Sequence, residues 1–139
     1  MASIFTKIIN GELPGHFVWR DEVAVAIMTI APVQPGHCLV IPVEEIDHWD
    51  DVPADISAHL MSVARKVAKA QKKVYQPKRV GIMVAGLEVP HTHYHLIPAN
   101  EITDLDFALQ QPAEAEALAT EAARLREALA ELGYASAEE

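Results

Sequence analysis

The sequence has a single cysteine, Cys38, among its 139 residues. One thiol excludes an internal disulfide and any zinc site built from several cysteines. Cys38 begins the apolar run Cys38–Ile41, where a small buried side chain is expected rather than a reactive thiol.

Basic residues are also scarce, since 11 Lys and Arg stand against 20 Asp and Glu and give a formal net charge of −9. Binding of a nucleic-acid backbone depends on clustered Lys and Arg, so no nucleic-acid partner is expected. A small nucleotide held by a local site remains compatible with this charge. Neither a leader segment nor an uninterrupted apolar run of membrane-spanning length is visible, so we expect a cytoplasmic protein without membrane contact.

The composition and the spacing of apolar residues fit one globular domain of the α+β class. Hydrophobic residues make up 50% and charged residues 22% of a chain without repeats or linkers. Apolar spacing predicts a short first helix, a long amphipathic helix, a C-terminal helix and five extended runs joined in hairpins, which favour an antiparallel sheet. The predicted helices cover residues 3–9, 53–75 and 112–132, and the strands cover residues 16–20, 23–28, 37–41, 80–84 and 91–97. We expect a single domain over residues 1–139, with a core of about residues 3–100 and a helical extension of about residues 112–133.

Three histidines, His91, His93 and His95, alternate with Thr92 and Tyr94. In a strand, side chains two residues apart leave on the same face, so the three imidazoles would line one surface at spacings of about 7 Å. Three explanations are open: incidental polar residues on a solvent-facing strand, a metal site, and nucleophilic or acid–base catalysis on phosphorus. Catalysis on phosphorus needs no metal and gives all three rings a role.

The pattern His-x-His-x-His over residues 91–97 resembles the motif of the histidine triad (HIT) family. Two further blocks are similar to that family: residues 4–14, and residues 32–42 with a fourth histidine, His37. The resemblance implies a HIT-like fold, an antiparallel sheet of about five strands with a long central helix and a C-terminal helix, pairing into a homodimer through a continuous sheet.

The resemblance also assigns roles to the four histidines. His93 would be the nucleophile and form a covalent nucleotidyl-histidine, while a backbone carbonyl oxygen holds its other ring nitrogen. His95 would contact the phosphate oxygens. His91 and His37 would form a supporting hydrogen-bonded pair behind the nucleophile. Ile27, Thr29, Glu88 and Val89 are, with His95, the positions expected to contact substrate.

The chain departs from the family pattern at three places. Ser3 and Thr6 occupy the positions of a Cys-x-x-Cys pair that many members carry, so we expect no metal and no cofactor. Thr29 stands where related chains place an aspartate or asparagine against the ribose hydroxyls. The loop 85–90 is short and carries Glu88 in place of a glutamine and a hydroxyl residue, and Glu88 is either a general acid or an exposed loop carboxylate.

The sequence therefore predicts a metal-independent nucleotide hydrolase or nucleotidyltransferase. Its substrates would be nucleoside monophosphates, AMP-like or GMP-like, in phosphoramidate or related P–N and P–O linkages. The alternative is a nucleotide-binding or partner-binding protein that keeps the fold with little catalysis.

Overall fold

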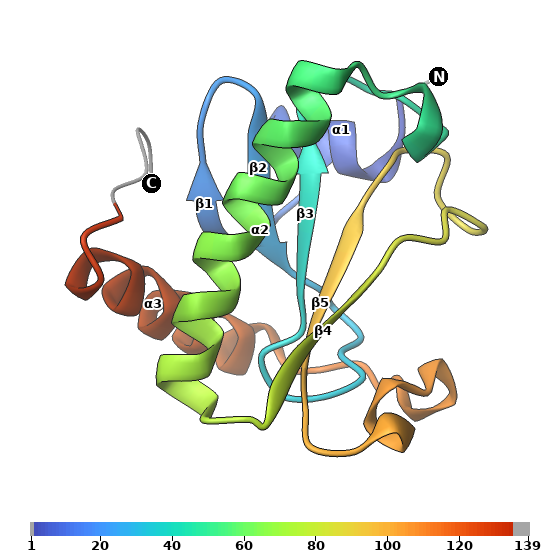
Figure 1. The fold of residues 1–139 in the computed structure, drawn as a ribbon. Helices are drawn as coiled ribbons and strands as arrows, with labels where there is room; N and C mark the ends of the chain where they lie inside the picture. Colours follow the sequence, from blue (N-terminus) through green and yellow to red (C-terminus); the bar gives the residue numbers. More distant parts are fainter. Residues whose placement is uncertain (1, 135–139) are drawn as a thin grey trace.

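The protein folds around a five-stranded sheet, seen here in a computed structural model that describes residues 2–134 (Figure 1). The strand order is β1-β2-β3-β5-β4, and every neighbouring pair is antiparallel. The strands are β1 (Phe17–Arg20), β2 (Ala24–Met28), β3 (Cys38–Pro42), β4 (Arg79–Met83) and β5 (Tyr94–Ala99). The predicted α+β class with an antiparallel sheet is thus confirmed.

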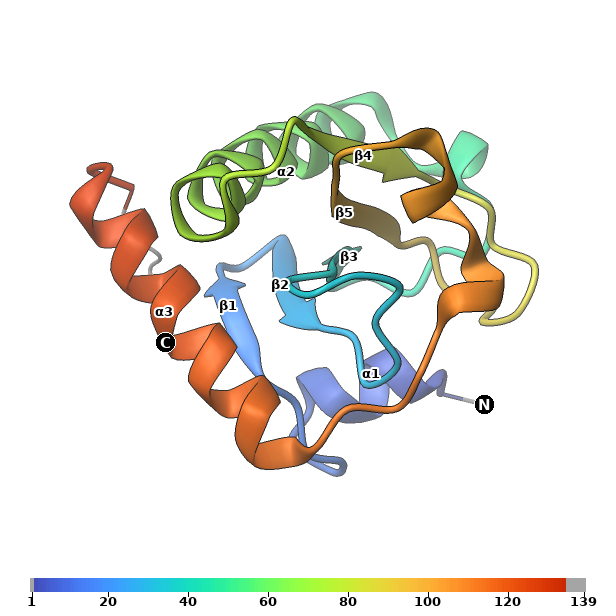
Figure 2. The ribbon, with the colours of Figure 1, turned by 90° about the horizontal axis from the view of Figure 1, so that it is seen from below.

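Helices cover both faces of the sheet (Figure 2). Helix α2 (Ala54–Tyr75) lies on one face, and the short helix α1 (Ile4–Ile9) lies on the other. All residues of β2 and β3 are buried as a result, because each side chain meets a helix whichever way it points. Two apolar clusters follow, one beneath α2 and one beneath α1.

The C-terminal helix α3 (Ala115–Glu131) packs against α2 and against the edge strand β1. Its buried side chains follow helical spacing, as the sequence predicts, and are Leu118, Ala122, Leu125, Ala128 and Leu129. The helix ends at Glu131, Leu132 caps it, and Gly133 follows with a φ of +83°, a conformation in which an L side chain is strained. Helix α3 therefore contributes to the main core.

The strand that carries the histidine motif is shorter than predicted. It begins at Tyr94, so His91, Thr92 and His93 precede it in irregular chain. The chain turns here because the amide of His91 donates to the carbonyl of Val89 and that of Thr92 donates to the carbonyl of Ile46. Because these residues are outside the ladder, the prediction of one flat face with three imidazoles is wrong.

Two short 3₁₀ turns that the sequence pattern did not predict follow β5, at Ile102–Leu105 and Phe107–Leu109. They bring Phe107 back against the rings of His37 and His95. This segment therefore closes one side of the histidine cluster.

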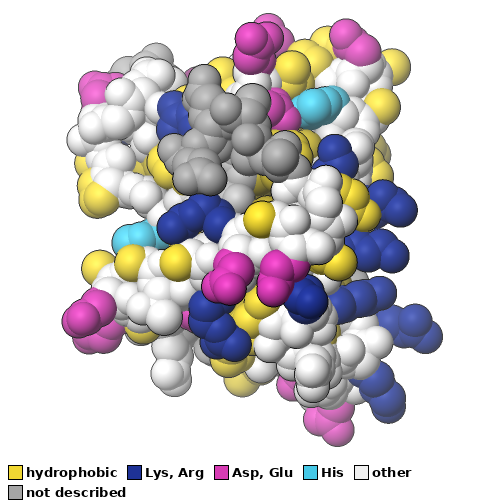
Figure 3. All heavy atoms as spheres, turned by 90° about the vertical axis from the view of Figure 1, so that its left-hand side faces the viewer, with side chains coloured by type: hydrophobic (Ala, Val, Ile, Leu, Met, Phe, Trp, Pro, Cys, Tyr) yellow, Lys and Arg dark blue, Asp and Glu magenta, His cyan; other side chains and the backbone are white. Residues whose placement is uncertain are grey.

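Charge is unevenly distributed over the surface. Lys and Arg side chains gather along the right-hand edge of the face in Figure 3. The exposed basic residues of α2 are Arg65, Lys69, Lys72 and Lys73. The histidine segment 91–99 carries no Lys or Arg. Within residues 2–134, no helix combines the length and the apolar character needed to cross a membrane.

Candidate functional site

His93 is held in one tautomer by the backbone. Its Nδ1 lies 2.7 Å from the carbonyl oxygen of His91, which can only accept a hydrogen bond, so Nδ1 carries the proton. The lone pair of Nε2 is therefore free to attack, and the predicted carbonyl contact is confirmed. Burial lowers the pKa of His93, an effect that the hydrogen bond to His91 and the charge of Glu88 partly oppose.

Two rings fix the plane of the His93 imidazole. Phe5 from α1 and His95 from β5 each meet it edge to face, with ring centroids 4.9 Å away. The separation of His93 and His95 is thus shorter than the 7 Å or so expected from a regular strand. His93 is 7% exposed, so its reactive edge is reached from a confined space.

His37 pairs with His95, and not with His91 as the sequence predicted. The Nε2 of His37 lies 3.0 Å from the Nδ1 of His95, and the Nδ1 of His37 accepts from the amide of Val33. His37 therefore donates from Nε2, which leaves the proton of neutral His95 on its own Nε2. Burial, with the neighbouring imidazoles, lowers the pKa of His37 to about 3 and that of His95 to about 4.

His91 instead belongs to the α1 side of the site. Its Nε2 lies 2.8 Å from the carbonyl oxygen of Pro42, and its Nδ1 lies 2.7 Å from the Oγ of Ser3. Nε2 must donate to the carbonyl, so neutral His91 accepts the hydroxyl proton of Ser3 at Nδ1. Strand register explains the corrected pairing. Leu39 of β3 lies opposite His95, and His37, two residues before Leu39, is therefore close to His95, whereas His91 lies outside that ladder.

Ser3 and Thr6, two of the positions at which the sequence departs from the HIT pattern, are engaged in hydrogen bonds. The amide of Ser3 and the Oγ1 of Thr6 both donate to Oε1 of Glu45 at 2.7 Å. The Ser3 hydroxyl also caps α1 by accepting from the amide of Thr6. Among residues 2–134, no three His, Cys, Asp or Glu side chains are grouped so as to hold a metal ion.

A cavity of about 390 Å³ lies between α1, β2 and the start of α3, and Phe5, whose ring contacts that of His93, is part of its lining. Its size suits a small organic ligand, and its lining is almost entirely apolar. Two expected substrate contacts are in its wall: Ile27, and Thr29 at the end of β2. The other lining residues are Ile4, Phe5, Ile8, Leu13, Pro14, Gly15, His16, Met28, Ile30, Leu39, Ala113, Ala115 and Leu118.

Glu88 and Val89 lie outside that lining. Val89 packs against the α1 cluster, and Glu88 is exposed on the loop before the histidines. A smaller space of about 90 Å³ adjoins His93 and is bordered by Asp47, Trp49 and Gly86 among others. The small polar space thus adjoins His93 directly, whereas the apolar cavity is linked to His93 through the ring of Phe5.

Gln71 of α2 is a site residue that the sequence analysis missed. It is fully buried, and its Nε2 donates to the carbonyl of Gly36 at 2.8 Å and to that of Leu96 at 3.1 Å. These carbonyls neighbour His37 and His95, so one amide ties together the two segments that carry the pair. The available signal was a polar residue on the apolar stripe of the helix, four residues after Val67.

Replacing Gln71 by leucine should lower turnover as well as stability. Two buried carbonyls would lose a donor, at a cost of about 1–3 kcal/mol in unfolding free energy. A shift of the paired histidines should lower kcat about 10- to 100-fold. Urea unfolding and steady-state kinetics measure both effects, with Ser62→Leu on the exposed side of α2 as the control. A stable variant with normal kcat would show that Gln71 does not position the pair.

Comparison with known proteins shows a family relationship. Residues 10–102 match the family model described as HIT domain. An uncharacterised HIT-like protein of Methanocaldococcus jannaschii is 37% identical over 102 residues, covering 70% of this chain and 79% of its own. The adenosine 5′-monophosphoramidase of Saccharomyces cerevisiae is 34% identical over 101 residues, covering 72% of this chain and 64% of its own.

The fold is also similar to solved structures. A HIT-like protein of Bartonella henselae, described as involved in cell-cycle regulation, superposes with a TM-score of 0.80 and 30% identity. The match covers 91% of this chain and 95% of that one. Both the sequence and the fold thus lead to one conclusion: the chain belongs to the HIT domain family.

Proposed function

We propose that the protein is a nucleoside phosphoramidase that works through a covalent nucleotidyl-His93 intermediate. The observation that carries this proposal is the contact between Nδ1 of His93 and the His91 carbonyl, which leaves Nε2 as a neutral nucleophile. The lowered pKa of His93 keeps the ring unprotonated at neutral pH. The similarity to a protein named adenosine 5′-monophosphoramidase supports the same chemistry.

In the first step, Nε2 of His93 attacks the phosphorus atom and the bond from phosphorus to the leaving nitrogen breaks. The amine departs with a proton, and the nucleoside monophosphate remains bonded to His93. The Nε2 proton of His95, fixed by the hydrogen bond from His37, donates to a phosphate oxygen and stabilises its growing charge. Water then attacks phosphorus and the bond from phosphorus to Nε2 breaks, which releases the nucleoside monophosphate and neutral His93. The proton that the water loses to solvent balances the one that the amine gained.

The apolar cavity and the small polar space would receive the two ends of the substrate. The apolar cavity takes the nucleoside, with the base among α1 and β2 side chains and Thr29 offering one hydroxyl to the ribose. The smaller polar space takes the leaving group. Glu88, exposed on the loop before the histidines, lies near enough for its negative charge to affect His93. As a carboxylate it would accept a hydrogen bond from the leaving amine, and the proton that the amine gains comes from solvent.

Adenosine 5′-phosphoramidate tests the activity directly. We expect metal-independent release of AMP and ammonia, unchanged by a chelator. Tight AMP binding by calorimetry without turnover of several nucleoside phosphoramidates would overturn the activity and favour the alternative, a nucleotide-binding protein with little catalysis. Loss of turnover in chelator, restored by added metal, would overturn the metal-independent mechanism.

We also propose a homodimer formed through the free edge of β4, which pairs only with β5 among the described strands. This edge exposes Ile82 and Met83, at 48% and 37%, and an exposed apolar edge strand favours pairing with a second strand. Light scattering should give twice the chain mass of 15.2 kDa, and Ile82→Lys should give the monomer mass. Met61→Lys, at an exposed position of α2, is the matched control. A monomeric wild-type protein would contradict the proposal.

The cytoplasmic location stays a prediction from the sequence.

A further inference from the structure

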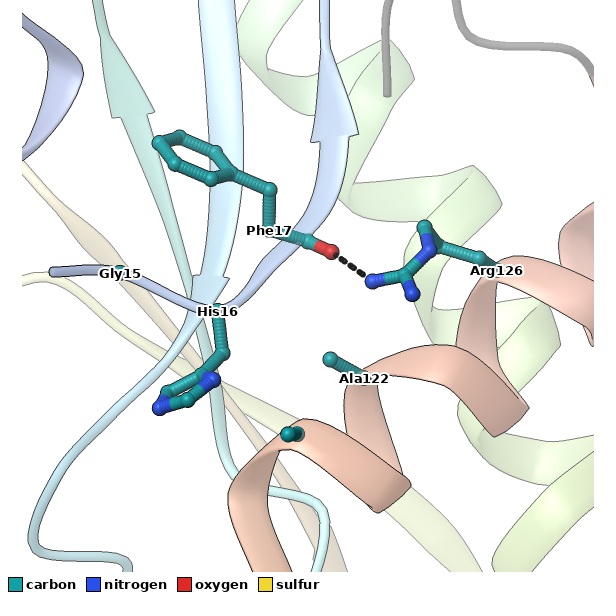
Figure 4. Close-up of a pocket in the computed structure, with 6 residues that line it drawn as sticks. Gly15, His16, Phe17, Ala122 and Arg126 are labelled. Atoms are coloured by element: carbon teal, nitrogen blue, oxygen red, sulfur yellow. Dashed lines mark hydrogen bonds between the residues drawn. The ribbon is translucent and has the colours of Figure 1, made fainter. Parts of the chain in front are cut away.

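A second cavity, of about 330 Å³, lies between α3 and the segment that leads into β1 (Figure 4). Its lining consists of Gly15, His16, Phe17, Ala119, Ala122 and Arg126. His16 and Arg126 lie on opposite sides of it, with the short side chain of Ala122 on the wall between them (Figure 4). The small side chains of Ala119 and Ala122 leave the space open, and the His16 and Arg126 side chains supply its polar surface.

Arg126 is held in place before any ligand arrives. Its Nη1 donates to the carbonyl oxygen of Phe17 at 2.7 Å, across from α3 to the edge strand. A guanidinium has five N–H donors, so this single contact leaves donors for a ligand. Because this hydrogen bond already orients the guanidinium, less conformational entropy is lost when an anion binds.

Among residues 2–134, no carboxylate lines the cavity, although Asp and Glu outnumber Lys and Arg by 20 to 11 in the chain. None of the ion pairs found among residues 2–134 includes Arg126. A half-buried guanidinium without an acidic partner favours an oxyanion, because a planar fork matches carboxylate or phosphate oxygens.

The second cavity adjoins the apolar one. Gly15 and His16 line both, and α3 covers both, with Ala115 and Leu118 over the apolar cavity and Ala119 and Ala122 over its neighbour. A ligand whose apolar part fills the first cavity could therefore extend a charged group past His16 into the second.

We propose that Arg126 and His16 form an oxyanion subsite that binds the phosphate or carboxylate group of a small ligand. When the apolar cavity holds a nucleoside, the subsite selects nucleotides with an anionic substituent on the base. This selectivity rests on the proposed function, whereas binding of the anion itself does not.

Titration with inorganic phosphate, followed by the NMR signals of the His16 ring and the Arg126 side chain, tests the subsite. Signals assigned to these residues separate this binding from any phosphate bound at His93, and sodium chloride of equal ionic strength controls for screening. We expect saturable shifts at both residues. Acetate in place of phosphate shows which oxyanion is preferred, and saturation by either supports the subsite.

Arg126→Gln should weaken binding about tenfold or more, because charge-assisted hydrogen bonds are lost. Arg124→Gln, at an exposed position of the same helix, should leave the affinity unchanged. Ala119→Glu, also at an exposed position, should abolish binding by placing a carboxylate at the cavity without disturbing the core. Shifts that do not saturate, or equal affinity in wild type, Arg126→Gln and Ala119→Glu, would overturn the subsite.

AMP that carries a carboxymethyl group on its exocyclic nitrogen tests the selectivity. This nucleotide should bind at least tenfold tighter than its ethyl analogue to wild type, and the preference should vanish in Arg126→Gln. Equal affinities for the two nucleotides would overturn the selectivity. Binding is measured without turnover, so an inactive protein with intact anion binding would refute the proposed activity and leave the subsite standing.

Discussion

Replacing His93 by glycine is expected to lower kcat for adenosine 5′-phosphoramidate by about 10⁴-fold or more, because no other group can form the bond to phosphorus. AMP should still bind with little change in Kd, since His93 is not among the residues that line the apolar cavity. Pre-steady-state kinetics and calorimetry measure these two quantities separately.

The matched control is His59→Ala on α2, whose ring pairs with Asp21 away from the triad. This variant should keep the wild-type kcat. A His93→Gly variant that retains more than about a tenth of the wild-type kcat would mean that water attacks phosphorus directly.

Acidification from pH 7 to pH 5 is expected to destabilise the fold. Burial holds the pKa of His37 near 3 and that of His95 near 4, while both return to about 6.5 on unfolding. The unfolded chain therefore binds more protons as the pH falls through 6.5, and stability is lost towards acid. Each such histidine contributes up to about 1.4 kcal/mol per pH unit across the window between its two pKa values.

The contribution of His37 can be isolated by urea unfolding at several pH values above 5. The lowered pKa values of Asp21 and Glu45 act mainly below this range, because carboxylates lose their stabilising effect only as they become protonated. His37→Gln should flatten the pH dependence by about 1.4 kcal/mol per pH unit, whereas His48→Gln, at an exposed loop position, should not. An unchanged slope in His37→Gln would mean that His37 is protonated in the native state.

The helices and strands could be predicted because their apolar spacing is local. Helix α2 begins and ends within one residue of its predicted bounds. In α3, the predicted stripe members Leu118, Leu125 and Leu129 are buried as expected, whereas Leu132, just after the helix, is exposed. The histidine strand was predicted too long, since alternation indicates an extended chain but not where its ladder begins. The turn at His91 depends on the carbonyl of Ile46, which lies far away in the sequence.

The roles of the histidines were harder to predict than their presence. The backbone contact of His93 follows from the motif because both partners are within it. The pairing of His37 depends on the register of β3 against β5, and the partner of His91 comes from the start of α1. Such contacts between distant segments leave no periodic pattern, so a correct motif led to a wrong pair.

The most direct test is intact-protein mass spectrometry after rapid acid-free quenching of wild-type protein mixed with adenosine 5′-phosphoramidate. A nucleotidyl-enzyme intermediate predicts a transient mass increase of one adenylyl group, placed on His93 by peptide mapping and absent from His93→Gly. Full turnover with no adduct at any quench time, or an adduct on another residue, would contradict the role assigned to His93.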